Sequence, residues 1–154
     1  MTIPPEYQAV AAGLRDSVPF VRTLGLVFEE LSAERAVLRL PDEPAHRNHV
    51  GGPHAGAMFT VAESASGAVV LASFGHLLDR ATPLPVNAQI HFRKIALGPM
   101  VAEAVLGRPA AEVIAELDAG SRPEFPVEVE LRTEDGTPTG SVTVVWTLRP
   151  NRRD

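Results

Sequence analysis

The sequence contains no cysteine at any of its 154 positions. A thiol nucleophile and a thiolate metal site are therefore excluded, and cysteine usage gives no information on the redox compartment. Basic residues are also in the minority, because 14 Lys and Arg stand against 19 Asp and Glu, for a net charge of −5. That balance argues against a broad electrostatic surface for nucleic acid, so no nucleic-acid partner is expected.

Targeting signals and internal repeats are likewise missing from the sequence. The N-terminus lacks the basic segment and apolar run of a secretory signal peptide. The stretch 55–74 is apolar enough for a membrane span, but its Ala, Gly and Ser content and its central Glu63 favour a covered core helix. We therefore expect a cytoplasmic protein that forms one domain over residues 1–154 and has no membrane partner.

Periodicity in the sequence predicts an α+β fold with an antiparallel sheet. Strands alternate apolar and polar residues, most clearly over 86–94, whereas helices repeat apolar residues every three or four positions. Proline in a first turn and glycine after a last turn mark the ends of the short helix. The expected elements are an N-terminal helical segment within 1–23, two strands within 24–40, a long helix over 55–75, strands over 86–94 and 100–106, a short helix over 109–119, and strands over 126–133 and 140–149.

The segment 48–56, followed by Glu63, is the most informative part of the chain. A loop dense in Gly, Pro and His before an apolar helix indicates that the backbone there approaches a ligand or another part of the chain closely. A lone carboxylate among apolar neighbours is costly to bury unless it has a partner or a chemical role. The helix N-terminus offers free backbone N–H groups at Ala55 and Gly56, and small residues near Glu63, including Thr60 and Gly67, leave room for a ligand.

The spacing of these residues resembles the PaaI-like acyl-CoA thioesterases, a branch of the hotdog-fold family. Their motif has an Asn in the loop, a His-Gly-Gly six residues later, and an acidic residue nine beyond that His. Asn48, the run His54-Ala55-Gly56, and Glu63 stand at those spacings here. The segment 89–99 is similar to the family's next strand, and the resemblance covers roughly 24–149. It implies a curved antiparallel sheet wrapped around a long central helix.

Three departures from the motif suggest a less characterised branch of the family. Ala55 replaces the usual first Gly, but its backbone N–H remains. Glu63 replaces the commoner Asp and so moves the carboxylate by one methylene. The predicted helix over 109–119 is an insertion that the plain pattern lacks.

The resemblance implies an acyl-CoA or acyl-carrier-protein thioesterase with two sets of site residues. The catalytic set is Glu63 as base or nucleophile, with Asn48, His54, Ala55 and Gly56 around the substrate carbonyl. The substrate-binding set is Thr60, Gly67, Asn87, Gln89, His91, Arg93 and Lys94. Arg93 and Lys94 would contact the phosphates of coenzyme A, which enters only as part of the substrate, and no cofactor or metal is expected.

The resemblance also implies a homodimer with composite sites, in which Glu63 faces the loop of the partner. Such a dimer would pair the strand over 86–94 with its copy and so cover an exposed edge. Whether two dimers associate further into a tetramer stays open. Simpler explanations of individual residues also stay open: a satisfied core carboxylate at Glu63, a helix cap at His54, and a solvated strand end at Arg93 and Lys94.

Two other functions compete with hydrolysis at this point. Dehydratases of the same fold that act on 3-hydroxyacyl thioesters pair a loop His with a helix Glu fourteen residues later, as His49 and Glu63 are spaced. A catalytically silent hotdog protein that only binds an acyl thioester is the third possibility. A metal site at His46, His49 and His54 is not favoured, because no acidic residue stands in register with them.

Overall fold

A computed structural model describes residues 3–152, so the predicted N-terminal segment 1–23 is described from its third residue. The helices are α1 (Pro5–Ser17), α2 (Pro19–Leu24), α3 (Ala55–Phe74) and α4 (Ala110–Asp118), and the strands are β1 (Val27–Leu31), β2 (Arg35–Leu40), β3 (Ala81–Phe92), β4 (Met100–Leu106), β5 (Glu124–Thr133) and β6 (Pro138–Pro150). Two short 3₁₀ turns, Pro44–His46 and Gly75–Leu77, precede and follow α3.

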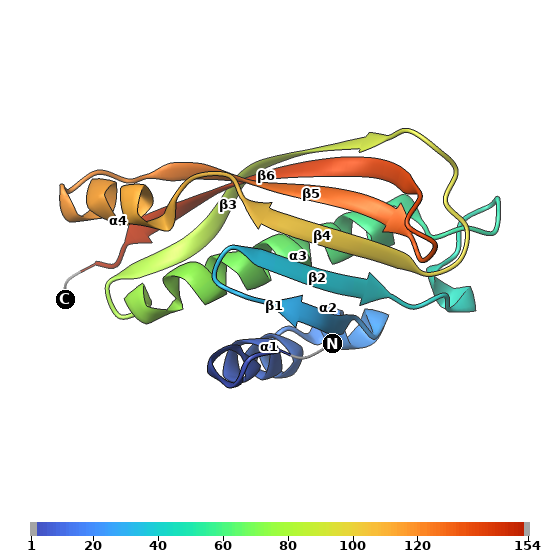
Figure 1. Cartoon of the computed structure of the whole chain (residues 1–154), viewed down its shortest axis with the longest axis horizontal. Helices are drawn as coiled ribbons and strands as arrows, with labels where there is room; N and C mark the ends of the chain where they lie inside the picture. The colour runs from blue at the N-terminus through green and yellow to red at the C-terminus, as the bar shows by residue number, and fades with distance from the viewer. Residues whose placement is uncertain (1–2, 153–154) are drawn as a thin grey trace.

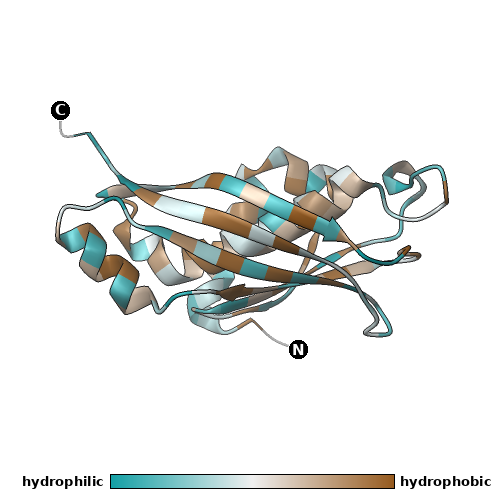
Figure 2. Cartoon of the chain, turned by 90° about the horizontal axis from the view of Figure 1, so that it is seen from above, coloured by the Kyte–Doolittle hydropathy of each residue, from teal (hydrophilic) through white to brown (hydrophobic). Residues whose placement is uncertain are grey.

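All six strands form one antiparallel sheet in the order β1-β2-β4-β5-β6-β3. The sheet curves around α3, which runs along its inner face (Figure 1). Apolar and polar residues alternate along the strands (Figure 2), so one face packs on the helix and the other meets solvent. This arrangement confirms the predicted α+β hotdog fold.

The core is built where the small residues of α3 meet the large residues of the sheet. Twelve of the 20 residues of α3 are buried, and four of these are alanine. Alanine lets the sheet approach closely, and β5 fills the space with residues such as Phe125, whose ring centroid lies 5.0 Å from that of Phe74. α3 and the turn after it, Ala55–Leu77, are long and apolar enough to span a membrane. Within this segment, however, 67% of the most apolar 18-residue stretch is buried inside the protein, so α3 is the core helix. A cytoplasmic location stays a prediction.

One stripe of α3 is only half-buried, although the sequence predicts cover on nearly every face. Thr60, Glu63, Gly67 and Leu71 lie on this stripe, spaced by three or four residues along one side of the helix. α1 and α2 pack against α3, and so do β2, β4 and β5. We call these four residues the open stripe.

β3 is an edge strand and is longer than predicted, because it begins at Ala81 rather than near Val86. Two prolines, Pro83 and Pro85, pair with Leu148 and Trp146 of β6. Proline removes a backbone donor, which an edge strand tolerates on its open side. The pairing register shifts after Pro85, so the strand carries a bulge there.

The N-terminal segment, predicted as helical within 1–23, forms two helices. Pro19 begins α2, at a position where its missing N–H costs nothing. Ala11 of α1 and Val21 and Leu24 of α2 are buried in the core. The two helices therefore cover one side of α3.

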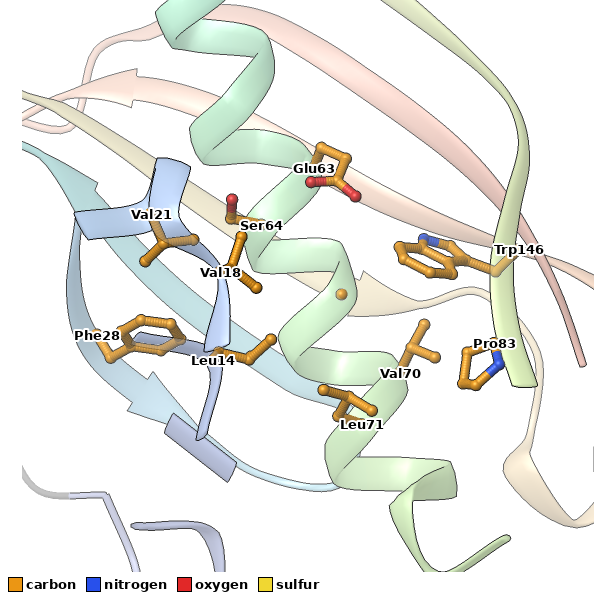
Figure 3. A pocket seen from close by; sticks show the side chains of 11 residues that line it. Leu14, Val18, Val21, Phe28, Glu63, Ser64, Val70, Leu71, Pro83 and Trp146 are labelled. Atoms are coloured by element: carbon orange, nitrogen blue, oxygen red, sulfur yellow. The ribbon is translucent and has the colours of Figure 1, made fainter. Parts of the chain in front are cut away.

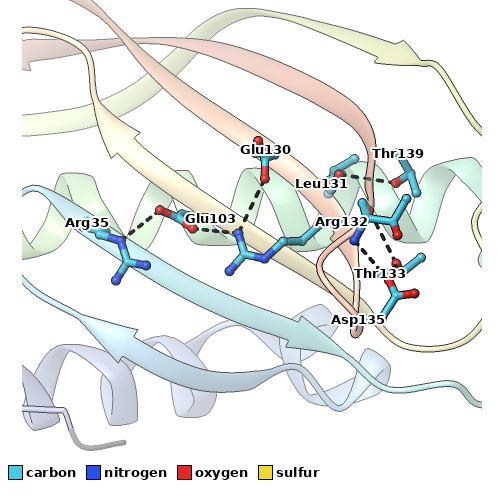
Figure 4. A network of polar contacts seen from close by, with 9 residues as sticks. Arg35, Glu103, Glu130, Leu131, Arg132, Thr133, Asp135 and Thr139 are labelled. Carbon is cyan, nitrogen blue, oxygen red and sulfur yellow. Dashed lines mark hydrogen bonds and ion pairs between the residues drawn. The ribbon is translucent and has the colours of Figure 1, made fainter.

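The outer face of the sheet carries a network of charges around Glu103 (Figure 4). Arg35 Nε on β2 donates to Glu103 at 3.0 Å, and Arg132 on β5 donates to the other carboxylate oxygen at 2.6 Å. The Arg35 hydrogen bond, supported by Arg132, holds the pKa of Glu103 below its usual value. Ala102 and Ala104 on either side of Glu103 are buried, so this network faces away from α3.

Candidate active site

The loop before α3 is held together by the side chain of Asn48. Its Oδ1 accepts hydrogen bonds from the N–H groups of Val50 and Gly52 at 3.0 and 3.2 Å, and its Nδ2 donates to the Pro53 carbonyl at 3.3 Å. Gly52 is required here, because a Cβ at this position would lie 2.1 Å from the carbonyl oxygen of Ala96. Asn48 therefore organises the loop, and its amide keeps one further hydrogen for a ligand.

His54 caps the start of α3, as the simpler sequence explanation held. The Gly56 N–H donates to His54 Nδ1 at 2.8 Å. The expectation of a free N–H at Gly56 is therefore wrong, because the neighbouring imidazole occupies it. A neutral His54 that accepts at Nδ1 carries its hydrogen on Nε2, so its outward nitrogen acts as a hydrogen-bond donor.

Ala55 supplies the helix N–H that the cap leaves available. It is the first residue of α3, where an amide has no acceptor within the helix, and it is exposed. The positive end of the helix dipole adds to the attraction for a developing negative charge. A cavity of about 340 Å³ lies beside it, lined also by Asn48, Arg93 and Lys94. We call this hollow the loop cavity.

Glu63 lies at a second, more enclosed cavity of about 260 Å³ (Figure 3). The other lining residues are almost all apolar: Leu14, Val18, Val21, Phe28, Ser64, Gly67, Val70, Leu71, Pro83 and Trp146. Burial alone raises the pKa of the Glu63 carboxyl above its usual value. We call this hollow the acid cavity.

No side chain among residues 3–152 satisfies the Glu63 carboxylate by a hydrogen bond or an ion pair. Ser66, on the buried side of the helix, uses its hydroxyl to donate to the Glu63 backbone carbonyl at 2.7 Å rather than to the carboxylate. The explanation of Glu63 as a satisfied core carboxylate therefore has no support here. A half-buried acid of this kind is typical of a functional site.

Ser66 and Trp146 fix the wall of the acid cavity. The indole Nε1–H of Trp146 donates to Ser66 Oγ at 3.0 Å, and both side chains are buried. This chain of hydrogen bonds ties β6 to the turn of α3 that carries Glu63. The tryptophan ring is thereby held in one orientation opposite Gly67, where an added Cβ would stand 3.6 Å from the ring.

The structure separates the predicted catalytic residues: Glu63 lies at the acid cavity, Asn48 and Ala55 lie at the loop cavity, and His54 and Gly56 line neither. Ala55 and Glu63 are eight residues apart on one helix, which is roughly 12 Å at 1.5 Å per residue. The loop cavity contains Asn48 and Ala55, whereas the acid cavity contains Glu63 and Gly67. Within one protomer, the candidate base and the candidate oxyanion donor do not meet.

The remaining predicted residues lie outside both cavities. Thr60 donates to the Gly56 carbonyl at 2.8 Å and lines a third, more open hollow with His54. Asn87, Gln89 and His91 are exposed on the edge strand β3. His49 lies in the loop and lines neither cavity.

Several lining residues of the acid cavity were missed in the sequence. Leu14 and Val21 come from α1 and α2, Phe28 from β1, and Trp146 from β6. They lie far apart in the chain, and their only sequence signal is that they are apolar. As for metals, no group of three or more His, Asp or Glu side chains suited to an ion occurs in the part of the chain that the structure describes.

Comparison with known proteins places this geometry in a family. Residues 7–148 match the sequence profile described as "Domain of unknown function (DUF4442)". No curated protein matches the chain in sequence.

Solved structures share its fold over nearly the whole chain. A Pseudomonas aeruginosa protein described as a probable thioesterase superposes with a TM-score of 0.84 at 28% identity, over 97% of this chain and 99% of that one. A thioesterase family protein from Silicibacter pomeroyi superposes with a TM-score of 0.76 at 20% identity, over 94% of this chain and 99% of that one. A second P. aeruginosa thioesterase, solved as a mutant, gives 0.73 at 19% identity, over 96% of each chain. The resemblance to hotdog thioesterases is confirmed, whereas membership of the PaaI-like branch stays a prediction.

Proposed function

This chain belongs to the DUF4442 family, and from that premise we propose that it hydrolyses acyl thioesters, with acyl-CoA or acyl-carrier-protein as the substrate. One observation carries the proposal: the half-buried carboxylate of Glu63 stands without a partner group, among the described residues, at the apolar acid cavity. The structural neighbours named as thioesterases give the proposal its reaction class.

The reaction follows from the chemistry of the two cavities. The Glu63 carboxylate takes a proton from water, whose oxygen attacks the thioester carbonyl, or it attacks that carbon itself to form an anhydride that water then hydrolyses. Negative charge that develops on the carbonyl oxygen is stabilised by the Ala55 N–H and the helix dipole. The carbon–sulfur bond breaks, the sulfur takes up a proton, and a carboxylic acid and a free thiol leave.

Burial of Glu63 assists the first step. A base works best when its pKa lies near the working pH, and burial raises the pKa of this carboxyl towards neutrality. The reaction as proposed uses no metal and no separate cofactor, because coenzyme A is part of the substrate.

A homodimer would complete the site. Ala55 lies roughly 12 Å from Glu63 along the same helix, so the two groups of one protomer do not reach the same substrate carbonyl. A two-fold partner that pairs its β3 with this β3 would bring its own loop cavity to the acid cavity. Glu63 and the acyl pocket would then come from one protomer, and Ala55, Asn48 and the cations from the other. Arg93 and Lys94, which line the loop cavity with Ala55, suit the phosphates of coenzyme A.

A panel of acyl-CoA substrates with a thiol-reactive dye tests the proposal. We expect thiol release that Glu63→Ala abolishes, while His49→Ala keeps most of the activity. Loss of enoyl absorbance without thiol release, abolished by His49→Ala, would instead show a dehydratase. Tight binding of acyl-CoA with no turnover of any kind would show a binding protein.

A further inference from the structure

We infer that the acid cavity binds the acyl chain and selects hydrocarbon acyl groups without polar substituents, of about eight to ten carbons. This inference rests on the proposed thioesterase function and adds the class of substrate. It also assigns a role to α1 and α2, which form the wall of the cavity that faces α3.

The chemistry of the walls selects a hydrocarbon. Glu63 and Ser64 lie at one end of the cavity, and Leu71 lies at the other end, two turns of α3 further on (Figure 3). Between them the lining consists of aliphatic and aromatic side chains together with Gly67. An acyl tail with a hydroxyl, amide or carboxylate would lose its water here without gaining a hydrogen bond, so polar tails should bind poorly.

The size of the cavity sets the length of the chain. A dry apolar cavity of about 150 Å³ accommodates the six carbons of benzene, so by proportion about 260 Å³ accommodates roughly ten carbons. Leu71 follows Glu63 by eight positions, which is roughly 12 Å along the helix and comparable to the length of an extended chain of this size. Both dimensions point to a medium-chain acyl group.

The N-terminal helices make this cavity a partly enclosed slot rather than an open groove on α3. Leu14 from α1, Val18 at the junction, and Val21 from α2 lie across the cavity from Val70 and Trp146 (Figure 3). Leu14 and Val18 are partly exposed, as expected for side chains that form a wall and not the centre of the core. A smaller residue on α1 would therefore lengthen the slot without removing the core.

Gly67 keeps the slot open beside the catalytic carboxylate. It lies one turn after Glu63 on the open stripe, and an added Cβ would stand 3.6 Å from the ring of Trp146, in ordinary contact. Alanine therefore fits here without strain, and any longer side chain must extend into the cavity. The hydrogen bond from Trp146 Nε1 to Ser66 Oγ fixes the tryptophan ring, so the ring does not move aside to make room for a larger side chain at Gly67.

Two variants with opposite effects test the slot. Thiol release is measured with saturated acyl-CoAs from four to sixteen carbons, and we expect the highest kcat/KM at about eight to ten carbons. Gly67→Leu should move the optimum down by at least two carbons, with a tenfold or larger loss on the ten-carbon substrate and little loss on the four-carbon one. Leu14→Ala should move the optimum up by at least two carbons.

Matched controls separate cavity effects from helix effects. Gly13→Ala makes a glycine substitution on α1 at a position where an added Cβ meets nothing within 4 Å. Val10→Ala shortens an apolar side chain of α1 that packs on the core but does not line the cavity. Both controls should leave the preferred chain length unchanged, and thermal melts of all variants report whether they fold.

The possible failures are distinguishable from one another. If no acyl-CoA releases thiol, the proposed function itself is wrong. If thiol is released but the rate does not depend on chain length, or the folded Gly67→Leu and Leu14→Ala proteins keep the wild-type optimum, the slot is elsewhere. An optimum at four carbons or at sixteen carbons would also overturn the inference.

Discussion

At the scale of single residues, the Glu63 carboxylate combines a cost in stability with the proposed catalytic role. Burial raises the pKa of the Glu63 carboxyl, so the folded state binds the carboxyl proton more tightly than the unfolded chain does. Its ionisation therefore destabilises the fold at pH values above the raised pKa, and this penalty is absent below the ordinary glutamate pKa. A carboxylate kept under such a penalty fits a group retained for chemistry and not for stability.

Glu63→Gln should therefore inactivate the protein and stabilise it at the same time. Thiol release should fall by about 10²–10⁴-fold, the range that one general acid–base group supplies. The thermal midpoint at neutral pH should rise, because the amide carries no charge to desolvate, and the rise should shrink as the pH falls towards the ordinary glutamate pKa. Melts of both proteins at several pH values check this. A lower midpoint at neutral pH would show that the ionised carboxylate has a stabilising partner.

The position of Ala55 allows the proposed oxyanion donor, its backbone N–H, to be removed without damage to the helix. Proline is well tolerated at the first position of a helix, and His54 before it already has the extended backbone that a residue before proline prefers. Ala55→Pro should thus keep the thermal midpoint close to that of the wild type and lower kcat by about 10²–10³-fold. Ala55→Gly keeps the N–H and serves as the control. Unchanged kcat in the folded proline variant would place the oxyanion elsewhere.

At the scale of the elements, the Glu103 network is expected to make the sheet sensitive to acid. Arg35 and Arg132 hold the pKa of Glu103 below its usual value. The ionised Glu103 therefore stabilises the fold above the ordinary glutamate pKa, and this stabilisation is lost as the pH falls through the lowered pKa. Glu103→Gln should lower the free energy of unfolding at neutral pH by about 1 kcal/mol, because solvent screens these partly exposed charges. The difference should vanish in acid. Glu34→Gln, an exposed change of the same charge, is the control and should leave the free energy of unfolding at neutral pH nearly unchanged.

Most elements could be predicted because their apolar periods are strong and their ends are marked. The predicted helix over 55–75 corresponds to Ala55–Phe74, and the insertion over 109–119 corresponds to Ala110–Asp118. α2 as a separate helix and the first part of β3 could not be predicted for one shared reason: proline is disfavoured in the interior of a helix or a strand. Pro19 begins a helix here, and Pro83 and Pro85 occupy a sheet edge, where a missing N–H does little harm.

The candidate site residues in the loop and on α3 could be identified from their spacing, because the loop and α3 are continuous in sequence. Their hydrogen bonds could not: a helix cap at His54 was one open alternative, and only the structure shows that this cap occupies the Gly56 N–H. The acid cavity could not be predicted at all. It needs Leu14 and Trp146, from opposite ends of the chain, on either side of α3, and only the folded sheet decides that placement.

At the scale of the whole molecule, a single chain leaves its functional parts uncovered. The open stripe of α3 is half-buried, and β3 exposes its edge together with large apolar side chains. Val86, Phe92, Ile95 and Leu97 are exposed by 44%, 53%, 76% and 60%. Exposed apolar residues that gather along one strand and the turn after it are typical of an interaction surface. These features support the proposed two-fold pairing through β3.

The composite site can be tested by mixing two inactive proteins. In a dimer of one Glu63→Gln chain and one Ala55→Pro chain, a site shared between protomers receives both defects at one end of the interface and neither at the other. Random pairing makes half of the dimers mixed, each with one intact site of two, so co-refolded proteins should recover about a quarter of the wild-type activity. Each variant refolded alone provides the baseline, and analytical ultracentrifugation verifies the dimer. Were both groups to act within one chain, every mixed dimer would hold only damaged sites, and the mixture would show no more than the average of its two inactive parents.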